Sequence, residues 1–552
     1  MRVPLLPVVL ALAACGAPER TPPPGDGGGG GGGGGGDLPA ADVTVAVDTT
    51  TGRRAISPLV YGYNAGTRAE APPGATWLRL GGNRWTAYSW VSNYSNAGSD
   101  WGPYSNDTFM GSPADGPAAA ARTTLDDAKG TGVGVLVTIP MQGWVAKDAA
   151  GNVNPDGPLA DHFVPMAPRK GAAFTLAPAA ASTTVWADEL ANWCSSRWGA
   201  GAGLGFSLDN EPDLWSSTHR EIQRTALTYA AFLSRSTEWA AALKDAVPGA
   251  QVFGPASYGW AGYVNLQGAP DAAGRDFLDF YLDGMKAASG GRRLLDALDL
   301  HFYSEAYGCG VRVNDATSAQ RNSDCVVAAR VQAPRSLHDA AYKEPSWITG
   351  CCTNGEGIRL LPRMLAKLDA HYPGTLLSIS EYHHGGGDHV SGAVAQADAL
   401  GALGRGGAHA AALWPLQADE SWPRAAWRAY RNYDGEGHDF GDVSVPAVST
   451  DLTHVSGWAA VGASDPDRVT VVLVHRPGAT LDGQGNPAGV DGKGSRVVRV
   501  ALTHARPLAH ARAWRLEGGA SPAWTAQAAA VVQGTVTLTL PYLSVTVLEL
   551  TP

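Results

Sequence analysis

Residues 204–212 read Leu-Gly-Phe-Ser-Leu-Asp-Asn-Glu-Pro. The apolar half predicts a short buried strand, and the polar half predicts the turn that leaves it. Pro212 stiffens this turn on one side of Glu211, and the Asn210 amide flanks it on the other. A carboxyl group held at the end of a buried strand is suited to general acid catalysis, provided that the fold supplies a second carboxylate nearby.

Seven further segments resemble this strand, and helical patterns separate most of them. Regular alternation of strands and helices predicts a parallel sheet covered by helices, and eight strands are the number that closes a TIM-like (β/α)8 barrel. The fold class is therefore α/β, with predicted helices at 218–246, 360–371 and 391–405. The expected strands are 59–63, 77–80, 133–139, 204–208, 251–254, 297–302, 376–380 and 411–414.

The pattern changes near residue 438. Segments such as 468–475, 497–502 and 535–540 alternate or run apolar between Gly- and Pro-rich turns, which is typical of an antiparallel β-sandwich. Residues 42–48 are also strand-like, and we expect them to join that sandwich. The predicted organisation is an N-terminal sandwich strand (41–55), a catalytic barrel (56–437) and a C-terminal β-sandwich domain (438–552).

The first 40 residues indicate export. Arg2 precedes a short apolar run, and residues 12–15 read Leu-Ala-Ala-Cys, which matches a bacterial lipobox. We therefore expect a signal peptide at 1–15 with a lipidated Cys15, or an ordinary secretory signal cleaved nearby. Residues 16–40 hold ten consecutive glycines and predict a flexible tether. The protein would be anchored at the bacterial cell envelope, touching the membrane only through Cys15, or be secreted.

Composition narrows the possible partners. Of the 552 residues 44% are hydrophobic and 17% charged, the net charge is −10, and no basic stripe occurs, so nucleic acid is not an expected partner. We expect a monomer.

Five cysteines follow Cys15, an odd number, and Cys194 is the candidate free thiol. Cys309, Cys325, Cys351 and Cys352 could pair in several ways, and the spacing favours no zinc site.

A second glutamate follows another predicted buried strand. Residues 376–382 read Leu-Leu-Ser-Ile-Ser-Glu-Tyr, which places Glu381 at the end of the seventh strand, as Glu211 is at the end of the fourth. Inward-facing groups at these two ends meet across the mouth of a barrel. Two carboxylates about 5 Å apart are the pair that a retaining glycosidase uses as nucleophile and acid/base. The alternative is that each glutamate is only a solvated or capping group.

Other polar and aromatic residues lie at the ends of predicted strands. Each could serve the site or could have only a structural role in the core. Arg79 could keep Glu381 ionised or form a core salt bridge. His301 and Tyr303 could orient Glu381 and contact a sugar, or be satisfied core groups. Trp414 could form the floor of a sugar site or pack inside the barrel. Among the 18 tryptophans, five in predicted loops could stack on sugar rings or belong to the core: Trp85, Trp90, Trp101, Trp144 and Trp215.

From about Ile56 onward, several motifs together resemble glycoside hydrolase family 44. They are the segments 81–88 (Gly-Gly-Asn-Arg-Trp-Thr-Ala-Tyr), 93–101 (Asn-Tyr-Ser-Asn-Ala-Gly-Ser-Asp-Trp), 210–215 (Asn-Glu-Pro-Asp-Leu-Trp), 380–382 (Ser-Glu-Tyr) and 430–435 (Tyr-Arg-Asn-Tyr-Asp-Gly). The stretch 304–355, which contains four of the cysteines, departs from the family's pattern and looks enlarged.

This resemblance implies a barrel with a β-sandwich and a retaining endo-β-1,4-glucanase that acts on cellulose-type polymers and xyloglucan. It implies Glu211 as acid/base and Glu381 as nucleophile. Such chemistry needs no cofactor and no catalytic metal, although a structural calcium ion is compatible with it. The expected substrate-binding residues are Arg79, Asn83, Trp85, Trp101, Trp144, Asn210, Trp215, His301, Tyr303, Tyr382 and Trp414.

The two carboxyl groups should differ in pKa. Glu381 should be ionised and heavily hydrogen-bonded, while the negative charge of Glu381 should raise the pKa of Glu211. Two alternatives stay open: a surface lipoprotein that binds polysaccharide without cutting it, and a barrel hydrolase that acts on mannan or xylan.

Overall fold

The computed structural model describes residues 40–100, 104–199 and 202–552. The predicted signal peptide, Cys15 and almost all of the tether lie outside these residues, as does Trp101. None of the helices within the described residues has the length and hydrophobicity of a transmembrane segment.

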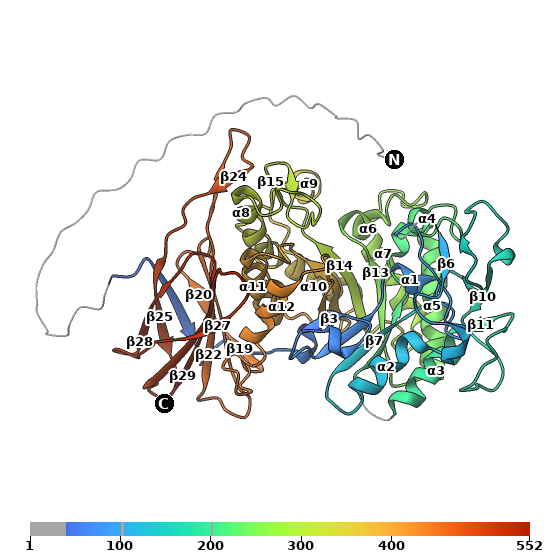
Figure 1. The fold of residues 1–552 in the computed structure, drawn as a ribbon, viewed down its shortest axis with the longest axis horizontal. Helices are drawn as coiled ribbons and strands as arrows, with labels where there is room; N and C mark the ends of the chain where they lie inside the picture. Colours follow the sequence, from blue (N-terminus) through green and yellow to red (C-terminus); the bar gives the residue numbers. More distant parts are fainter. Residues whose placement is uncertain (1–39, 101–103, 200–201) are drawn as a thin grey trace, which may run out of the picture. The chain divides into compact units, whose positions relative to one another are not determined.

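Eight parallel strands close into a barrel, as the alternating pattern predicted (Figure 1). Pairing between β7 and β12 completes the ring. The strands are β3 (Gly62–Asn64), β4 (Trp77–Leu80), β7 (Gly134–Ile139), β12 (Leu204–Leu208), β13 (Gln251–Ser257), β14 (Ala297–Tyr303), β17 (Leu376–His383) and β18 (Ala410–Leu413).

The barrel's interior is packed with side chains rather than open. Trp77, Leu136 and Phe253 form a separate cluster with three alanines of β14 and β18, and each of these side chains is almost fully buried. Filling of this kind is expected of an eight-stranded barrel, and it confines any site to the ends of the strands.

Helices connect the strands and cover the ring (Figure 1). The longer ones are α2 (Ala119–Ala128), α3 (Ala187–Trp198), α5 (Tyr229–Ala246), α7 (Phe277–Ala288), α8 (Asp324–Gln332), α10 (Leu360–His371) and α11 (Val390–Gly406). The shorter ones are α1 (Asn83–Thr86), α4 (Trp215–Thr218), α6 (Trp260–Asn265), α9 (Trp347–Cys351) and α12 (Ser421–Ala426).

Four predicted boundaries were wrong by three residues or more. The fifth strand continues to Ser257 instead of ending at residue 254. The first strand begins at Gly62 because residues 58–60, starting with Pro58, form a 3-10 turn. The helix expected from 218 begins at Tyr229, where the Thr228 side chain accepts a hydrogen bond from the Ala231 N–H and caps it. The seventh strand continues to His383, so Glu381 lies inside β17 rather than beyond it.

Small sheets of two or three strands lie in the loops of the barrel. They comprise β5 (Ser95–Asn96) with β6 (Ser105–Asp107) and β9 (Gly151–Asn152), β8 (Trp144–Ala146) with β10 (Phe163–Ala167) and β11 (Val185–Trp186), and β15 (Tyr307–Gly308) with β16 (Val311–Arg312).

Two larger sheets form the β-sandwich around a core of Val and Leu side chains. The N-terminal strand β1 pairs parallel with β25 and antiparallel with β20, so both ends of the described chain contribute to one sheet. One sheet has the order β20 (Ala447–Ser449), β1 (Val43–Asp48), β25 (Arg496–Thr503), β28 (Thr535–Leu540). The other has the order β2 (Arg54–Ala55), β19 (Val443–Val445), β21 (Val455–Val461), β22 (Val469–His475), β29 (Ser544–Thr551), β26 (His510–Leu516), β27 (Trp524–Gln527).

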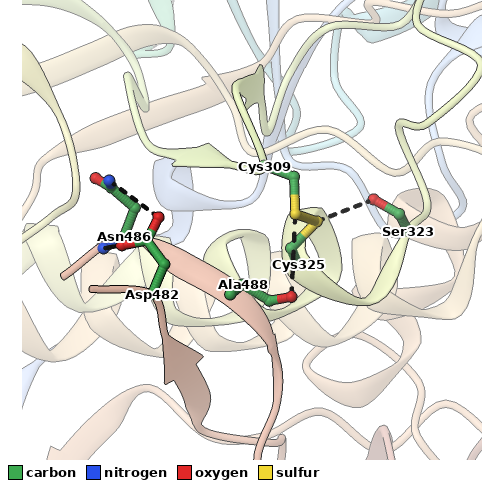
Figure 2. The surroundings of a disulfide bond; sticks show 6 residues. All are labelled: Cys309, Ser323, Cys325, Asp482, Asn486 and Ala488. Atoms are coloured by element: carbon green, nitrogen blue, oxygen red, sulfur yellow. Dashed lines mark hydrogen bonds between the residues drawn. A yellow bond between two sulfur atoms is a disulfide. The ribbon is translucent and has the colours of Figure 1, made fainter. Parts of the chain in front are cut away.

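A hairpin of the sandwich, β23 (Ala479–Leu481) and β24 (Pro487–Val490), contacts the enlarged loop of the barrel. The Cys309 N–H donates to the Pro487 carbonyl at 3.2 Å, beside a disulfide between Cys309 and Cys325 (Figure 2). The second disulfide joins Cys351 to its neighbour Cys352. Cys194 is a free thiol, as predicted, and its side chain is buried.

A buried ion pair joins the sandwich to helix α11. The Asp398 carboxylate accepts hydrogen bonds from Arg476 at 2.8 Å and from the Trp458 indole at 2.9 Å, and both charged side chains have no solvent exposure. The helix approaches closely here, because a β-carbon at Gly401 would lie 2.2 Å from the Trp458 ring. Burying two charges is tolerated only because each has polar partners.

Replacing Asp398 with Ala should therefore lower the free energy of unfolding by about 3–5 kcal/mol, since Arg476 would stay buried without its counter-charge. Denaturant unfolding measures the loss. Asp467→Ala is the matched control, because Asp467 pairs with Arg506 at the surface, where such pairs contribute about 0–1 kcal/mol. Equal losses in the two variants would contradict a structural role for the buried pair.

Candidate active site

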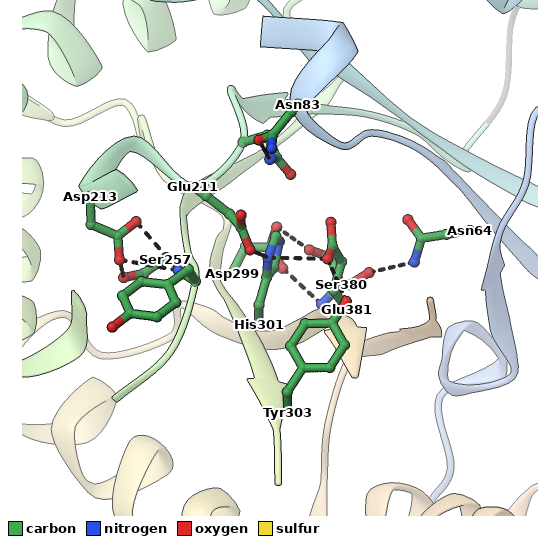
Figure 3. A network of polar contacts seen from close by, with 12 residues as sticks. Asn64, Asn83, Glu211, Asp213, Ser257, Asp299, His301, Tyr303, Ser380 and Glu381 are labelled. Carbon is green, nitrogen blue, oxygen red and sulfur yellow. Dashed lines mark hydrogen bonds and ion pairs between the residues drawn. The ribbon is translucent and has the colours of Figure 1, made fainter. Parts of the chain in front are cut away.

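Side chains at the C-terminal end of the barrel converge, among them Glu211, His301, Tyr303 and Glu381 (Figure 3). Arg79 comes from β4, Glu211 follows β12, His301 and Tyr303 end β14, and Glu381 lies in β17. Because parallel strands end at the same edge, residues far apart in the sequence converge there. One oxygen of Glu211, one oxygen of Glu381 and a ring nitrogen of His301 all lie within 4.8 Å of one another.

Glu381 is the more heavily bonded of the two carboxylates, as the sequence predicted. Arg79 donates to its Oε1 at 2.5 Å, and the Tyr303 hydroxyl donates to its Oε2 at 2.7 Å. Glu381 is only 4% exposed, so the guanidinium supplies a counter-charge where water does not. Burial and the charge of Glu381 hold the pKa of Tyr303 well above its usual value, so Tyr303 stays a donor.

Arg79 is completely buried and contacts more than Glu381. Its other contacts are the amide oxygen of Asn210 at 2.8 Å, the amide oxygen of Asn64 at 3.1 Å and Nε2 of His301 at 3.3 Å. A guanidinium can only donate, so Nε2 of His301 must be the acceptor. Burial lowers the pKa of His301 to about 4. The ring is therefore neutral and carries its proton on Nδ1.

That proton faces Glu211. Nδ1 of His301 lies 2.9 Å from Oε1 of Glu211 and 3.5 Å from Oε2 of Glu381. The hydrogen bond orients the Glu211 carboxyl and leaves its Oε2 able to carry a proton. Burial raises the pKa of Glu211 to about 7, Arg79 opposes this rise, and Asp100 adds to it. The predicted direction of this pKa shift is correct, but the predicted cause was wrong, because burial rather than the charge of Glu381 is its main cause.

Three adjoining cavities of about 510, 220 and 550 Å³ flank and enclose the two glutamates. The first shares Asn83, Asp100 and Trp414 with the central one, and the third shares Glu211 and Tyr303 with it. They therefore form one cleft that continues on both sides of the carboxyl pair.

Most of the predicted binding residues lie at this cleft. Arg79, Asn83, Trp85 and Trp414 line the first cavity, and Asn210 and Tyr303 line the central one. His301 bridges the two glutamates. Trp144 lies in β8 and lines none of the three cavities, and Trp101 is outside the described residues.

Two predicted binding residues are core residues instead. A third residue, Trp90, for which stacking on a sugar ring was one of two interpretations, also belongs to the core. Tyr382 follows Glu381 in a strand, so its side chain points to the opposite face, where its hydroxyl contacts Gln396 of α11 at 2.7 Å. Trp215 is fully buried, and its indole donates to the Asn210 carbonyl at 3.0 Å. Trp90 is also fully buried and tilts against Trp193.

Other residues of the cleft were not predicted. Trp347 is 43% exposed and lines the third cavity together with Tyr258, Trp260 and Arg312. The available signal was an aromatic residue in the enlarged loop 304–355, whereas the predicted sugar-binding tryptophans lie before residue 216 and at Trp414. Asp100 and Phe109 line the first cavity.

Among the residues that the structure describes, two groups of side chains could hold a divalent cation. Glu211, His301 and Glu381 form one, although the Arg79 charge that already neutralises Glu381 would repel a cation there. Asp434, Glu436 and His438 form the other. In that group, Nδ1 of His438 contacts Oδ2 of Asp434 at 2.5 Å.

Comparisons with known proteins agree with this geometry. Residues 94–306 match the profile of glycoside hydrolase family 44. The chain is 37% identical over 464 residues to Endoglucanase A of Paenibacillus lautus and 36% identical over 469 residues to Beta-mannanase/endoglucanase A of Caldicellulosiruptor saccharolyticus. Each match covers 79% of this chain, but the chain spans only 64% and 34% of those two proteins.

A solved structure is similar over its whole length. It is a xyloglucanase of family 44 from Paenibacillus polymyxa, with 33% identity and a TM-score of 0.84. The match covers 93% of this chain and 100% of the other.

The raised pKa of Glu211 can be measured directly. In protein labelled with ¹³C at the Glu side-chain carboxyls, one signal should titrate near pH 7, because burial favours the neutral form of Glu211. Glu211 should be protonated below that pH and ionised above it. The signal should vanish in Glu211→Gln and persist in Glu238→Gln, a variant of an exposed glutamate on α5. A Glu211 signal that titrates near pH 4.5 would contradict the burial effect.

Proposed function

Because the chain belongs to glycoside hydrolase family 44, we propose that it is a retaining, endo-acting hydrolase of β-1,4-glucosidic bonds in cellulose-type glucans and xyloglucan. Glu381 is the nucleophile and Glu211 the acid/base. The observation that carries the proposal is the carboxyl pair, whose facing oxygens lie within 4.8 Å across the mouth of the barrel. Retaining glycosidases need carboxyl groups about 5–5.5 Å apart, whereas inverting ones need room for a water molecule between them.

In the first step, Glu381 attacks the anomeric carbon and the glycosidic C–O bond breaks. Glu211 gives its proton to the departing oxygen, and an ester joins the sugar to Glu381. Arg79 and Tyr303 favour this step because their hydrogen bonds orient Glu381 for the attack. The neutral His301 holds Glu211 by one oxygen, which leaves the other to transfer the proton.

In the second step, the roles of the charges change. Esterification removes the negative charge of Glu381, so the positive charge of Arg79 acts on Glu211 without compensation. Because Arg79 lowers the pKa of Glu211, Glu211 is more readily ionised and can then accept a proton as the base. It takes a proton from water, the water oxygen attacks the anomeric carbon, and Glu381 is released with retention of configuration.

The shape of the cleft supports endo-action. Cavities of about 510 and 550 Å³ extend on either side of the carboxyl pair, so a long polymer could lie through the site with residues bound at both ends. Trp414 and Trp347 offer indole surfaces on the two sides, and sugar rings bury C–H surface against such faces.

Substrate choice within β-linked polymers is part of the proposal. The relatives are named as an endoglucanase, a xyloglucanase and a β-mannanase/endoglucanase. The last name favours mannan as a second candidate substrate, although this chain spans only 34% of that protein.

The reaction proposed here uses no metal ion. Export and lipid attachment through Cys15 stay predictions from the sequence.

The proposal predicts that the purified protein releases reducing ends from carboxymethylcellulose and xyloglucan faster than from mannan or xylan. Glu381→Gln should lower this activity by about 10⁴-fold or more, because it lacks the nucleophile. The exposed Glu238→Gln should keep full activity. Wild-type rates in Glu381→Gln would refute its role as nucleophile, and faster release from mannan or xylan would refute the proposed substrate.

Glu211→Ala should separate proton transfer from attack. Its kcat/KM on polymer should fall by about 10²–10⁴-fold, the range that general acid catalysis contributes. The kcat/KM for a 2,4-dinitrophenyl cellotrioside should fall far less, because that leaving group departs without protonation. Equal losses on both substrates would show that Glu211 is not the acid.

A further inference from the structure

The backbone of Glu211 has an unfavourable conformation. Its φ is 44° and its ψ is 56°, in the left-handed region that residues with a β-carbon rarely adopt. Its N–H donates at 2.9 Å to the carbonyl of Ala256, which lies near the end of β13. Ala256 also has a positive φ, of 56°. Such conformations persist only where surrounding contacts hold them.

Asp213 supplies contacts that hold this turn. Its Oδ2 accepts hydrogen bonds from the Ser257 hydroxyl at 2.7 Å and from the Tyr258 N–H at 3.1 Å (Figure 3). Asp213 is only 6% exposed. The fit is close on the other side, since a β-carbon at Gly262 would lie 1.8 Å from Oδ2. The carboxylate therefore bonds the turn that carries Glu211 to the end of β13.

We propose that Asp213 is a positioning residue for the acid/base Glu211, acting by fastening the Glu-Pro turn to Ser257 and Tyr258. The inference rests on the proposed function. Asp213 lines none of the three cavities, so it does not contact substrate itself.

The consequence for catalysis follows from where Tyr258 lies. Tyr258 and Glu211 line the same cavity of about 550 Å³, from which Glu381 is absent. In a retaining reaction the acid faces the leaving group. We therefore assign this cavity to the part of the polymer that departs when the glycosidic bond breaks. The bonds of Asp213 thus set the distance between the acid and the wall that orients the group it must protonate. Proton transfer requires hydrogen-bond reach, and small displacements reduce its rate strongly.

The test compares two leaving groups in Asp213→Ala. We expect kcat/KM for a 4-nitrophenyl cellotrioside, which benefits from protonation, to fall by about 10- to 100-fold. For the 2,4-dinitrophenyl cellotrioside, which does not, we expect a fall of less than about 3-fold, since the acid does not act in that bond cleavage. Active sites are counted by trapping the glycosyl–enzyme with a 2-deoxy-2-fluoro inactivator, so that loss of folded protein does not enter the ratio.

Three further variants distinguish positioning from general damage. Asp213→Asn should restore most activity, because its amide oxygen can accept both bonds that Oδ2 accepts. Ser257→Ala removes one of the two donors and should show a smaller loss with the same dependence on leaving group. Asp296→Ala is the matched control: Asp296 also accepts from a side chain (Lys244, 2.6 Å) and a backbone N–H (Val252, 2.7 Å), but before β14 at the opposite end of the barrel. It should change both substrates equally.

Equal losses on the two glycosides in both Asp213→Ala and Ser257→Ala, or no loss in either, would overturn the inference while leaving the proposed function intact. If Asp213→Ala does not fold, Ser257→Ala alone decides between these outcomes. A wild-type protein that hydrolysed neither glycoside would overturn the proposed function and this inference with it.

Discussion

The guanidinium of Arg79 is the charge around which the candidate site is organised. It is fully buried, and it donates to Glu381, Asn210, Asn64 and His301. Burying a positive charge is costly unless it is paired and hydrogen-bonded, and Glu381 supplies the counter-charge that Arg79 contacts. Because Arg79 can only donate, it also determines which nitrogen of His301 carries the proton. The sequence predicted that the two glutamates differ, and the structure shows the contacts behind the difference: Glu381 is bonded to Arg79 and Tyr303, whereas Glu211 contacts His301 through one oxygen and has its pKa raised to about 7.

The rest of the fold holds this arrangement in place. A packed barrel interior around Trp77 and Phe253 keeps the strand ends in register, and the bonds between Glu211, Asp213 and β13 hold the turn beyond the fourth strand. The sandwich is connected to the same framework at two places. The Asp398–Arg476 pair joins it to α11, and its hairpin contacts the loop near Cys309, which leads to Arg312 in the wall of the cleft. Contacts remote from the carboxyl pair thus shape the surface that a substrate meets.

Hydrophobic patterns in the sequence predicted an element correctly where a single pattern was sufficient to define it. The eight barrel strands were predicted because alternation of strands and helices has few other solutions, and the sandwich strands were predicted from their period of two. Both glutamates were selected as candidates because each lies near the end of a predicted buried strand. The errors occurred where two local readings compete. Trp215 and Tyr382 lie in the same motifs as Glu211 and Glu381, but a neighbouring position in a strand or turn faces the other way.

Residue order and hydrophobic periodicity alone determined the class of fold, the strand ends that carry Glu211 and Glu381, and the pairing of these two residues as candidates. Only the tertiary structure showed the contacts that make the two differ, because the burial of Glu211, the hydrogen bond from His301 and the Arg79 charge come from segments far apart in the sequence. It also decided that Trp347 and Asp213 belong to the site or its support and that Trp215 does not. The physical reason is that a pKa and an exposed surface depend on everything that surrounds a side chain in space, whereas a strand depends mainly on its own residues.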